Sequence, residues 1–192
     1  MQPTVRRVIT GQTPEGASVF THIEPVPRIQ RSSGLQWYGV WGWDELPSLP
    51  FCCSEPYAPR SVFPAPDGKG MRINTVVFPA GYGIKAPVPV APTEADAEYT
   101  RLAMAQSSGG KRHENGMHAT DTVDLAFVFS GEICLIQGDG SEVTLRPGDV
   151  LVQYGGVHAW QNRTDQPCMI CFVLLGASRR DDGPSAMARG GE

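Results

Sequence analysis

The stretch RPGDVLVQYGGVHAWQN, residues 146–162, contains a turn, a strand, a second turn and a histidine in close succession. Pro147 presets the φ angle of a turn over residues 146–149. DVLVQY (149–154) predicts a strand, because apolar and β-branched residues dominate it. This strand leads into a glycine-rich turn, and His158 follows the turn. The succession predicts short strands joined by tight turns, with a polar side chain at a strand edge.

The rest of the chain has a similar pattern. Glycine (22 residues) and proline (17 residues) are scattered and the apolar runs are short, which is typical of an all-β domain with many turns. QGDGSE (137–142) contains the Asp-Gly dipeptide that favours a hairpin. Closely spaced strands of this kind predict a small barrel or sandwich. The further predicted strands are 72–78, 124–131, 132–137, 142–145 and 169–176.

Length, composition and charge restrict the class of protein. The 192 residues suit one domain with a decorated N-terminal part, and 41 % hydrophobic with 19 % charged residues is an ordinary globular balance. The net charge of −4 argues against nucleic-acid binding, because no basic run could neutralise phosphates. No apolar run approaches the roughly 18–20 residues that span a bilayer, and residues 1–16 lack the apolar stretch of a secretory signal. We therefore expect a cytoplasmic protein that binds neither nucleic acid nor membranes.

The five cysteines are an odd number and include an adjacent pair, which makes a poor disulfide framework. They indicate thiols in a reducing compartment. Cys168 and Cys171 form a C-x-x-C pattern, but it lies in a predicted strand, where residues three apart face opposite sides. We therefore expect neither a zinc site nor a redox role for this pair.

The segment GLQWYGVWGWDELP (34–47) lies outside the succession of strands. Trp37, Trp41 and Trp43 share one parity in it, so a strand here would line one face with three indoles. That face would be a packed layer over the barrel or a dimer face, or else it would form a wall of the ligand pocket.

Residues 82–116 predict a long insertion. KAPVPVAP (85–92) is extended, and TEADAEYTRLAMAQ (93–106) predicts a short helix with Thr93 as its N-cap. A loop of this length in a compact domain is often a lid. The chain is thus expected to consist of N-terminal strands and an arm that pack on the barrel or a partner (1–70), a barrel with this insertion (71–177) and a disordered tail (178–192).

Two of the four histidines, His118 and His158, lie at the edges of predicted strands. Neutral imidazole is the commonest protein ligand of transition metals, and two histidines with one carboxylate form the facial ligand set of non-haem Fe(II) sites. Asp124 would complete this set. On one straight strand residues 118 and 124 would lie roughly 20 Å apart, so the chain has to reverse near residues 120–123. Otherwise His118 is a loop histidine, Asp124 bonds backbone groups and His158 is a satisfied polar side chain.

The stretch 116–176 resembles a small single-domain cupin of the RmlC-like type, which has one conserved β-barrel. The first cupin motif is His-x-His, three or four residues, Glu, six residues and Gly. It matches His118, with Thr120 at the second histidine, Asp124 at the glutamate and Gly131 at the glycine.

The second cupin motif matches in Gly148, Gly156, His158 and Asn162, with Tyr154 where proline is usual. For the fold, the resemblance implies a cupin or jelly-roll β-barrel. This barrel would carry extra N-terminal strands and a long loop–helix insertion before the first motif.

For function, the resemblance implies an enzyme that binds a small oxygenated organic substrate at a divalent-metal site. The ion would be Fe(II), or else Zn, Mn or Ni, with His118, Asp124 and His158 as ligands and the two histidines as catalytic residues. The reaction would be that of a dioxygenase, or of a lyase such as a decarboxylase or dehydratase. Because Thr120 is a poor metal ligand, this chain retains either a three-ligand site or the vestige of one.

Two alternatives stay open beside the metal enzyme. In a metal-free enzyme, His118 or His158 would act as general base or acid, and Asp124 would orient it. In a non-catalytic protein, the barrel would bind a small molecule without turnover.

Three side chains are candidates for substrate contact. Thr120 lies within the first motif, Arg72 on its strand would pair with a substrate carboxylate, and Trp160 would pack on the substrate. Small cupins commonly dimerise through N-terminal strands, so the resemblance also implies a homodimer. The aromatic stretch 34–43 has enough surface to serve as its interface.

Overall fold

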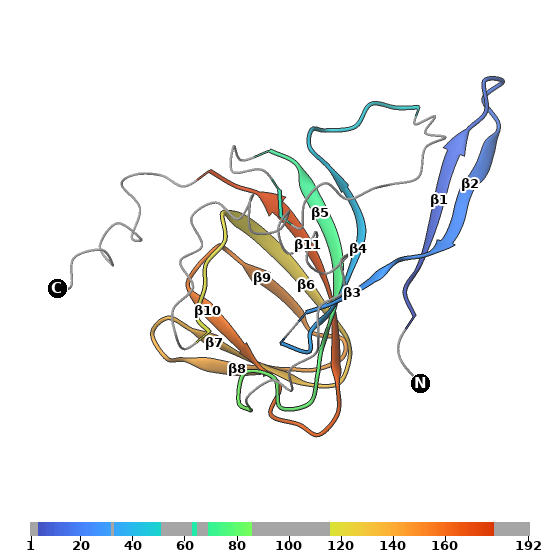
Figure 1. The fold of residues 1–192 in the computed structure, drawn as a ribbon. Coiled ribbons are helices and arrows are strands. Elements are labelled where there is room, and N and C mark those ends of the chain that lie inside the picture. Colours follow the sequence, from blue (N-terminus) through green and yellow to red (C-terminus); the bar gives the residue numbers. More distant parts are fainter. Residues whose placement is uncertain (1–3, 32, 51–62, 65–68, 86–115, 179–192) are drawn as a thin grey trace.

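The computed structural model describes residues 4–31, 33–50, 63–64, 69–85 and 116–178, and Figure 1 shows its fold. Every regular element in these ranges is a strand, which confirms the predicted all-β class. No helix in the described part of the chain has the length and apolarity to cross a membrane. The strands are β1 (Arg6–Gln12), β2 (Ser18–Pro25), β3 (Arg28–Gln30), β4 (Gln36–Trp43), β5 (Met71–Phe78), β6 (Thr122–Ser130), β7 (Ile133–Gln137), β8 (Glu142–Leu145), β9 (Val150–Gln153), β10 (His158–Gln161) and β11 (Cys168–Gly176).

Antiparallel pairing joins these strands into two larger sheets and one hairpin. The six-stranded sheet has the order β3-β4-β5-β11-β6-β9, the three-stranded sheet has the order β10-β7-β8, and β1 pairs with β2 alone. Side chains from both larger sheets meet in one buried core, so the sheets close on each other as a jelly-roll barrel (Figure 1). The predicted barrel architecture is thus confirmed. Its core comprises Leu35, Val76, Phe78, Ala126, Val128, Ile133, Leu135, Leu145, Trp160, Cys168, Ile170, Phe172 and Leu174.

The two turns predicted from the sequence connect the strands as expected. Between β8 and β9, the Asp149 N–H donates to the Arg146 carbonyl at 2.9 Å, and Gly148 has a φ of 95°. Between β7 and β8, the Gln137 N–H donates to the Ser141 carbonyl at 2.8 Å. These turns set the register in which β7, β8 and β9 bring their inward-facing side chains together.

The barrel interior has a polar end and an apolar end. Along β6, Thr122, Asp124, Ala126 and Val128 are buried and the residues between them are partly exposed, so these four face inward. Ala126 and Val128 belong to the apolar core, whereas Thr122 and Asp124 precede them at the polar end. Strand β5 also begins with buried polar residues on its inward face and ends with buried apolar ones.

The strand that contains Asp124 does not extend back to His118, as a site shared by the two residues requires. The chain bends at Asp121, and β6 begins at Thr122, slightly earlier than the sequence predicted. His118 does not extend β6 but pairs with His158 at the start of β10. The bend therefore carries His118 from β6 to the edge of the opposite sheet.

The tryptophans of β4 do not line one face, so that expectation is wrong. A register shift lies between Gly39 and Trp41, where one extra residue enters the strand. Trp37 lies before the shift and packs against the barrel core, opposite Val76 of β5. Trp41 and Trp43 lie after it and pair with β5 residues of the opposite parity, because a bulge reverses the alternation of side chains.

The two cysteines of the C-x-x-C pattern lie in one strand, as predicted. Cys168 is fully buried in the barrel core, whereas Cys171 is partly exposed. Both belong to β11, and both are free thiols. They lie on opposite faces of one strand, so they cannot bind one ion or form a disulfide with each other.

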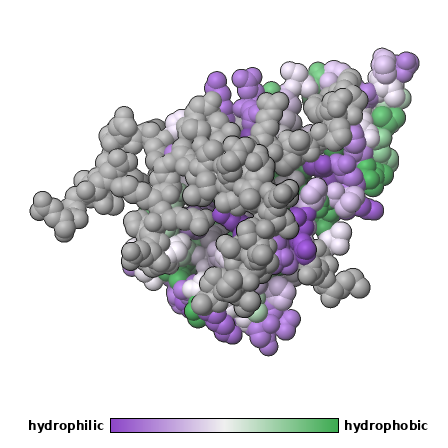
Figure 2. Space-filling view, viewed as in Figure 1, coloured by the Kyte–Doolittle hydropathy of each residue, from purple (hydrophilic) through white to green (hydrophobic). Residues whose placement is uncertain are grey.

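Strands β1 and β2 form a hairpin arm beside the barrel (Figure 1). Arg7 anchors this arm, because its side chain pairs with Glu24, donates to the Val40 carbonyl at 3.0 Å and lies 5.9 Å from the centroid of the Trp41 ring. Figure 2 shows hydrophobic surface on the arm. The exposed apolar side chains of the arm are Val8, Val19, Phe20 and Ile23. The predicted homodimer stays a prediction.

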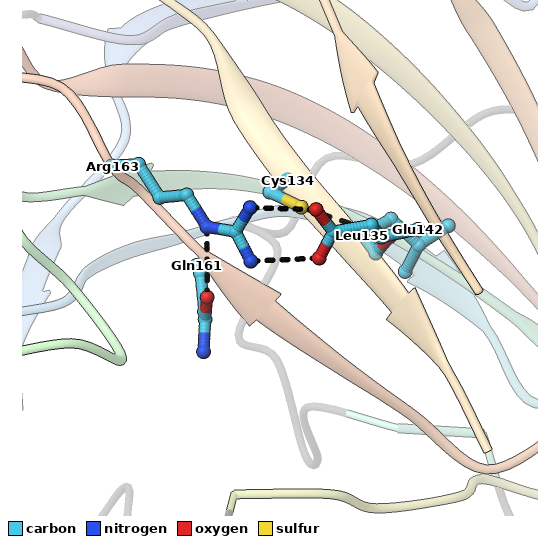
Figure 3. Close-up of polar contacts among 5 residues, drawn as sticks. All are labelled: Cys134, Leu135, Glu142, Gln161 and Arg163. Carbon is cyan, nitrogen blue, oxygen red and sulfur yellow. Dashed lines mark hydrogen bonds and ion pairs between the residues drawn. The ribbon is translucent and has the colours of Figure 1, made fainter. Parts of the chain in front are cut away.

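On the outside of the three-stranded sheet, Arg163 connects β8 to β10 (Figure 3). Its guanidinium donates two hydrogen bonds of 2.8 Å to Glu142 and one of 3.0 Å to Gln161. Cys134, on the strand between them, is buried, and burial raises the pKa of its thiol. Exposed ion pairs contribute only about 0–1 kcal/mol, so this contact mainly keeps β10 aligned with its neighbours.

Several predictions from the sequence fall on other parts of the chain. Residues 86–115 hold the predicted helix and most of the predicted insertion, and residues 179–192 hold most of the predicted tail. Both ranges lie outside the described residues. The division of the chain into 1–70, 71–177 and 178–192 stays a prediction.

Gly131, between β6 and β7, provides a test of the barrel packing. Its φ is 73°, and an added Cβ atom would lie 2.4 Å from the carbonyl oxygen of Pro167. Gly131→Ala therefore combines left-handed strain with a clash against backbone that cannot move aside. We expect a loss of roughly 2–4 kcal/mol in the free energy of unfolding, measured by urea titration.

Gly140 is the matched control for this substitution. Its φ is 83°, but an added Cβ atom would meet nothing within 4 Å. Gly140→Ala should therefore lose only about 1 kcal/mol, from backbone strain alone. Equal losses for the two variants would contradict the close approach of Gly131 to Pro167.

Candidate active site

Two histidines from distant parts of the chain lie side by side at the polar end of the barrel. The His118 N–H donates to the His158 carbonyl at 2.8 Å, and the His158 N–H donates to the His118 carbonyl at 2.9 Å. Their ring centroids are 4.4 Å apart. His158 is 3 % exposed, whereas His118 is half-buried. The structure thus brings these two predicted site residues together.

Backbone carbonyls fix the tautomer of both imidazoles. His118 Nδ1 lies 3.2 Å from the Gly116 carbonyl oxygen, and His158 Nδ1 lies 2.8 Å from the Gly156 carbonyl oxygen. A carbonyl oxygen only accepts hydrogen bonds, so Nδ1 of each ring carries the proton. Nε2 of each neutral ring then carries the lone pair, which makes it the nitrogen that accepts a proton or binds a metal.

Two glutamines lie on the strands next to those of His158 and Asp124. Gln137 Nε2 donates to Gln153 Oε1 at 3.1 Å. Gln137 is the register partner of His158 on the neighbouring strand, and Gln153 is the register partner of Asp124. We call Asp124, Gln153, Gln137, His158 and His118 the polar ring. Its residues belong to β6, β9, β7 and β10, except His118, which pairs with His158.

Asp124 is a buried carboxyl group with an oxygen atom that has no hydrogen-bond partner. Its side chain is 7 % exposed, and Oδ1 is buried without a partner. Thr122 forms a hydrogen bond to the carboxyl group. Burial raises the pKa of Asp124 from its ordinary value of 3.8 to about 6, against the lowering effect of this bond. The group therefore titrates close to neutral pH.

The pKa of His158 is lowered, whereas that of Asp124 is raised. Burial, and after it the charge of His118, lower the pKa of His158 from 6.5 to about 4, against the raising effect of the Gly156 carbonyl. The imidazole of His158 is thus neutral at physiological pH. The barrel thus holds a neutral imidazole and a separate carboxyl group of raised pKa, and both kinds of group transfer protons in enzymes.

The three predicted substrate contacts have other partners in this structure. Arg72 is buried, pairs with Asp44 and donates to the Trp43 carbonyl at 2.7 Å and to the Met71 carbonyl at 2.9 Å. It therefore binds the end of β4. The other two are Thr120, whose Oγ1 lies 2.7 Å from Oγ1 of Thr122, and Trp160, whose ring packs in the core.

Trp160 nevertheless adjoins the site. Its ring centroid lies 5.8 Å from that of His158 with an interplanar angle of 90°, and 5.9 Å from that of Phe78. The indole thus supports the face of the His158 ring from the apolar end of the barrel. Its position suits a structural role in orienting that imidazole.

The imidazole pair has the orientation of metal ligands, but the predicted three-ligand set is not assembled as the side chains stand. Metal-binding histidines usually donate their second ring N–H to a carbonyl or carboxylate group, as His118 and His158 do. Within the described ranges, no three His, Cys, Asp or Glu side chains gather closely enough to hold an ion. Asp124 therefore does not join the pair, and its role as a ligand stays a prediction.

Gln137 and Gln153 were missed in the sequence, although strand parity could have found them. Gln153 has the parity of Leu151 in β9, and Gln137 has the parity of Ile133 and Leu135 in β7. Those apolar residues face the core, so the glutamines are polar residues on an inward face. Such exceptions to an apolar pattern mark candidate site residues.

No family model matches the chain. A stretch of 63 residues is 35 % identical to the cupin-domain-containing oxidoreductase srdB of Neurospora crassa and covers 32 % of each chain. A stretch of 65 residues is 34 % identical to the cupin-domain-containing oxidoreductase fogC of Aspergillus ruber and again covers 32 % of each. The chain thus spans about a third of the length of these curated relatives.

Solved structures of similar fold include an RmlC-like cupin from Shewanella frigidimarina. It is 13 % identical, covers 81 % of this chain and 87 % of its own, and has a TM-score of 0.41. The DMSP lyase DddQ from Ruegeria pomeroyi is 17 % identical, covers 55 % of this chain and 38 % of its own, and has a TM-score of 0.35.

The opposite pKa shifts of Asp124 and His158 predict opposite effects of pH on stability. Because the pKa of Asp124 is raised, its ionisation lowers stability as pH rises from about 4 to 6. Because the pKa of His158 is lowered, its contribution is complete above pH 6.5 and is lost as pH falls toward 4. The two effects oppose each other between pH 4 and 6, at up to about 1.4 kcal/mol per pH unit each.

Single substitutions separate these effects. Relative to the wild type, Asp124→Asn should gain roughly 1–3 kcal/mol of unfolding free energy between pH 4 and 6, and His158→Asn should lose stability over the same rise in pH. Urea titrations at each pH measure both. Asp139→Asn is the control, because hydrogen bonds from Ser141 lower the pKa of that exposed carboxyl group. A pH-independent difference between Asp124→Asn and the wild type would contradict the burial of an unpaired carboxylate.

Proposed function

We propose, from the premise that this chain carries a cupin barrel, that it is an enzyme that transfers protons on a small oxygenated organic substrate at the polar ring. The observation that carries this proposal is the pair of imidazoles whose Nδ1 atoms are held by carbonyls. That arrangement leaves Nε2 as the basic nitrogen of each ring. A buried carboxyl group, Asp124, lies at the other end of the same ring of side chains.

In the proposed reaction, His158 acts as the base. Its Nε2 accepts a proton from the carbon atom beside a substrate carbonyl as the C–H bond breaks, and the electron pair moves to the carbonyl oxygen. Amide N–H groups of the polar ring are suited to stabilise the negative oxygen. The imidazolium then returns the proton to carbon.

His118 has a supporting part in this scheme. Its ring lies beside that of His158, and the two backbone bonds between the histidines fix the spacing. A positive charge on one ring disfavours a second charge on the other, so the pair takes up one proton beyond those on the two Nδ1 atoms. This sharing keeps one imidazole available as a base.

A metal-dependent form of the same site is the second candidate. The bonds from both Nδ1 atoms to carbonyls favour it, because they orient Nε2 as in metal-binding histidines. His118 and His158 would hold the ion with Asp124, and the ion would polarise a substrate oxygen as a Lewis acid. A dioxygenase or lyase would be the corresponding enzyme class.

Hydrogen exchange tests the proposed function without knowledge of the natural substrate. Small ketones and aldehydes are incubated with the protein in D2O and EDTA, and exchange of the protons beside the carbonyl is followed by 1H NMR. We expect exchange of at least one compound, and a decrease of roughly a hundredfold or more in His158→Ala, because a general base typically contributes that much. His22→Gln, on the hairpin arm, is the matched control and should retain the rate.

Two results would contradict proton transfer by the histidines alone. Exchange at equal rates in the wild type and His158→Ala would remove His158 from the reaction. Exchange that stops with EDTA, returns with Fe(II) or Zn and follows an ion lost in His158→Ala would favour the metal-dependent form.

A further inference from the structure

The unpaired oxygen atom of Asp124 marks a place for a ligand group. Among the described residues, four buried side-chain atoms have no hydrogen-bond partner: His22 Nδ1, Trp37 Nε1, Trp43 Nε1 and Asp124 Oδ1. Only Asp124 Oδ1 belongs to a carboxyl group, and only Asp124 lies in the polar ring. Its side chain faces the barrel interior and is 7 % exposed. Buried polar groups are hydrogen-bonded as a rule, and the described residues supply no donor to this acceptor.

Two donors that neighbour Asp124 in the described part of the chain have other partners. The Thr122 hydroxyl already bonds the carboxyl group and lies 2.7 Å from Oγ1 of Thr120. Gln153 is the cross-strand neighbour of Asp124, but its Nε2 donates to the Gly156 carbonyl oxygen at 3.4 Å. Its amide donor is therefore turned toward β10 and away from Oδ1.

Gln137 holds the Gln153 amide in that orientation. Its Nε2 donates to Gln153 Oε1 at 3.1 Å, which fixes which end of the amide faces β7. Without this bond, Gln153 could rotate and donate its N–H to Asp124. Gln137 is thus a positioning residue that keeps Oδ1 open to a ligand.

The surroundings of Asp124 favour a neutral donor over a cation. Its register partner on β11 is Leu174, and the next inward-facing residue on β6 is Ala126, both fully buried. An ammonium group would lose its hydration against this apolar surface, whereas a hydroxyl group loses much less. A hydroxyl group is therefore the donor that this position suits best.

We propose that Asp124 Oδ1 accepts a hydrogen bond from a substrate hydroxyl group, and that the substrate is an α-hydroxy carbonyl compound. The hydroxyl part of this inference rests on the unpaired oxygen and on the orientation of Gln153. The carbonyl part rests on the proposed function. The two parts can fail separately, so the test measures binding without turnover.

A matched pair of small ketones tests the hydroxyl group. Methoxyacetone carries a methyl group in place of the hydroxyl hydrogen of hydroxyacetone, so its oxygen cannot donate a hydrogen bond. Each is titrated into 15N-labelled full-length protein with EDTA, and binding is followed through the backbone amides of β6, β9 and β10. We expect hydroxyacetone to bind at least tenfold more tightly, because its hydroxyl group pairs a buried acceptor that methoxyacetone leaves unpaired.

Variants locate this preference within the polar ring. Asp124→Leu removes the acceptor and should reduce the affinity ratio to about one, and Asp124→Asn provides a second variant of nearly identical shape with a weaker acceptor. Gln137→Leu leaves Asp124 in place but releases Gln153, and should lower the ratio several-fold. A purely structural role of Gln137 would change both affinities equally and leave the ratio unchanged. Asp139→Asn, in the exposed turn after β7, is the control.

The outcomes distinguish this inference from the proposed function. A preference for hydroxyacetone that survives His158→Ala and is lost in Asp124→Leu supports the hydroxyl position, whatever the result of the exchange experiment. Equal binding of the two ketones by the wild type overturns the inference, and so does a ratio that Asp124→Leu leaves unchanged. Either of these results leaves the role of His158 as a base untouched.

Discussion

The pair of backbone hydrogen bonds between His118 and His158 is the constraint on which the site depends. Each histidine donates its backbone N–H to the carbonyl of the other, so the segment before β6 is fixed to the edge of β10. This fixes the spacing of the two rings. It also determines where the chain must bend, at Asp121, before β6 begins with its inward-facing polar residues. Without the bridge, His118 would be a loop residue with no defined relation to the barrel.

The apolar end of the barrel provides the rigidity that the polar end needs. Residues from both larger sheets pack there in one core, and Trp160 of this core contacts the ring of His158. At the polar end the same strands bury a carboxyl group with an unpaired oxygen and an imidazole with a lowered pKa. Such groups reduce stability, and they persist because the surrounding packing determines their positions. In enzymes it is common that the residues that stabilise the fold differ from the residues that react.

Much of the fold could be predicted because turn chemistry and strand parity are local properties. The Asp-Gly dipeptide, the Pro147 turn and the alternating strands gave element bounds that agree with the structure to within about two residues. The prediction that His118 approaches His158 rested on the resemblance and on the need for a chain reversal. The prediction for the tryptophans of β4 was wrong because one extra residue between Gly39 and Trp41 reverses the parity of the strand. No sequence pattern marks this extra residue.

The site itself was only partly predictable, for a physical reason. Parity shows which side chains face inward, but it does not show which strands are neighbours. The contact between Gln137 and Gln153 joins two strands that belong to different sheets, so parity could mark each residue as inward-facing but could not predict their contact. Arg72 shows the opposite case. Its charge suggested a substrate contact, but the end of β4 supplies Asp44 and the Trp43 carbonyl, and the Met71 carbonyl of β5 accepts a further hydrogen bond.

Proton transfer by His158 requires a neutral ring whose lone pair lies on Nε2, so the tautomer of His158 is the decisive observable. Long-range 1H–15N correlation spectra of 15N-histidine-labelled protein distinguish the two ring nitrogens. We expect a protonated Nδ1 and a lone-pair Nε2 for His158 at pH 7, with the ring still neutral near pH 5. A proton on Nε2, or an imidazolium at pH 7, would contradict proton transfer by His158.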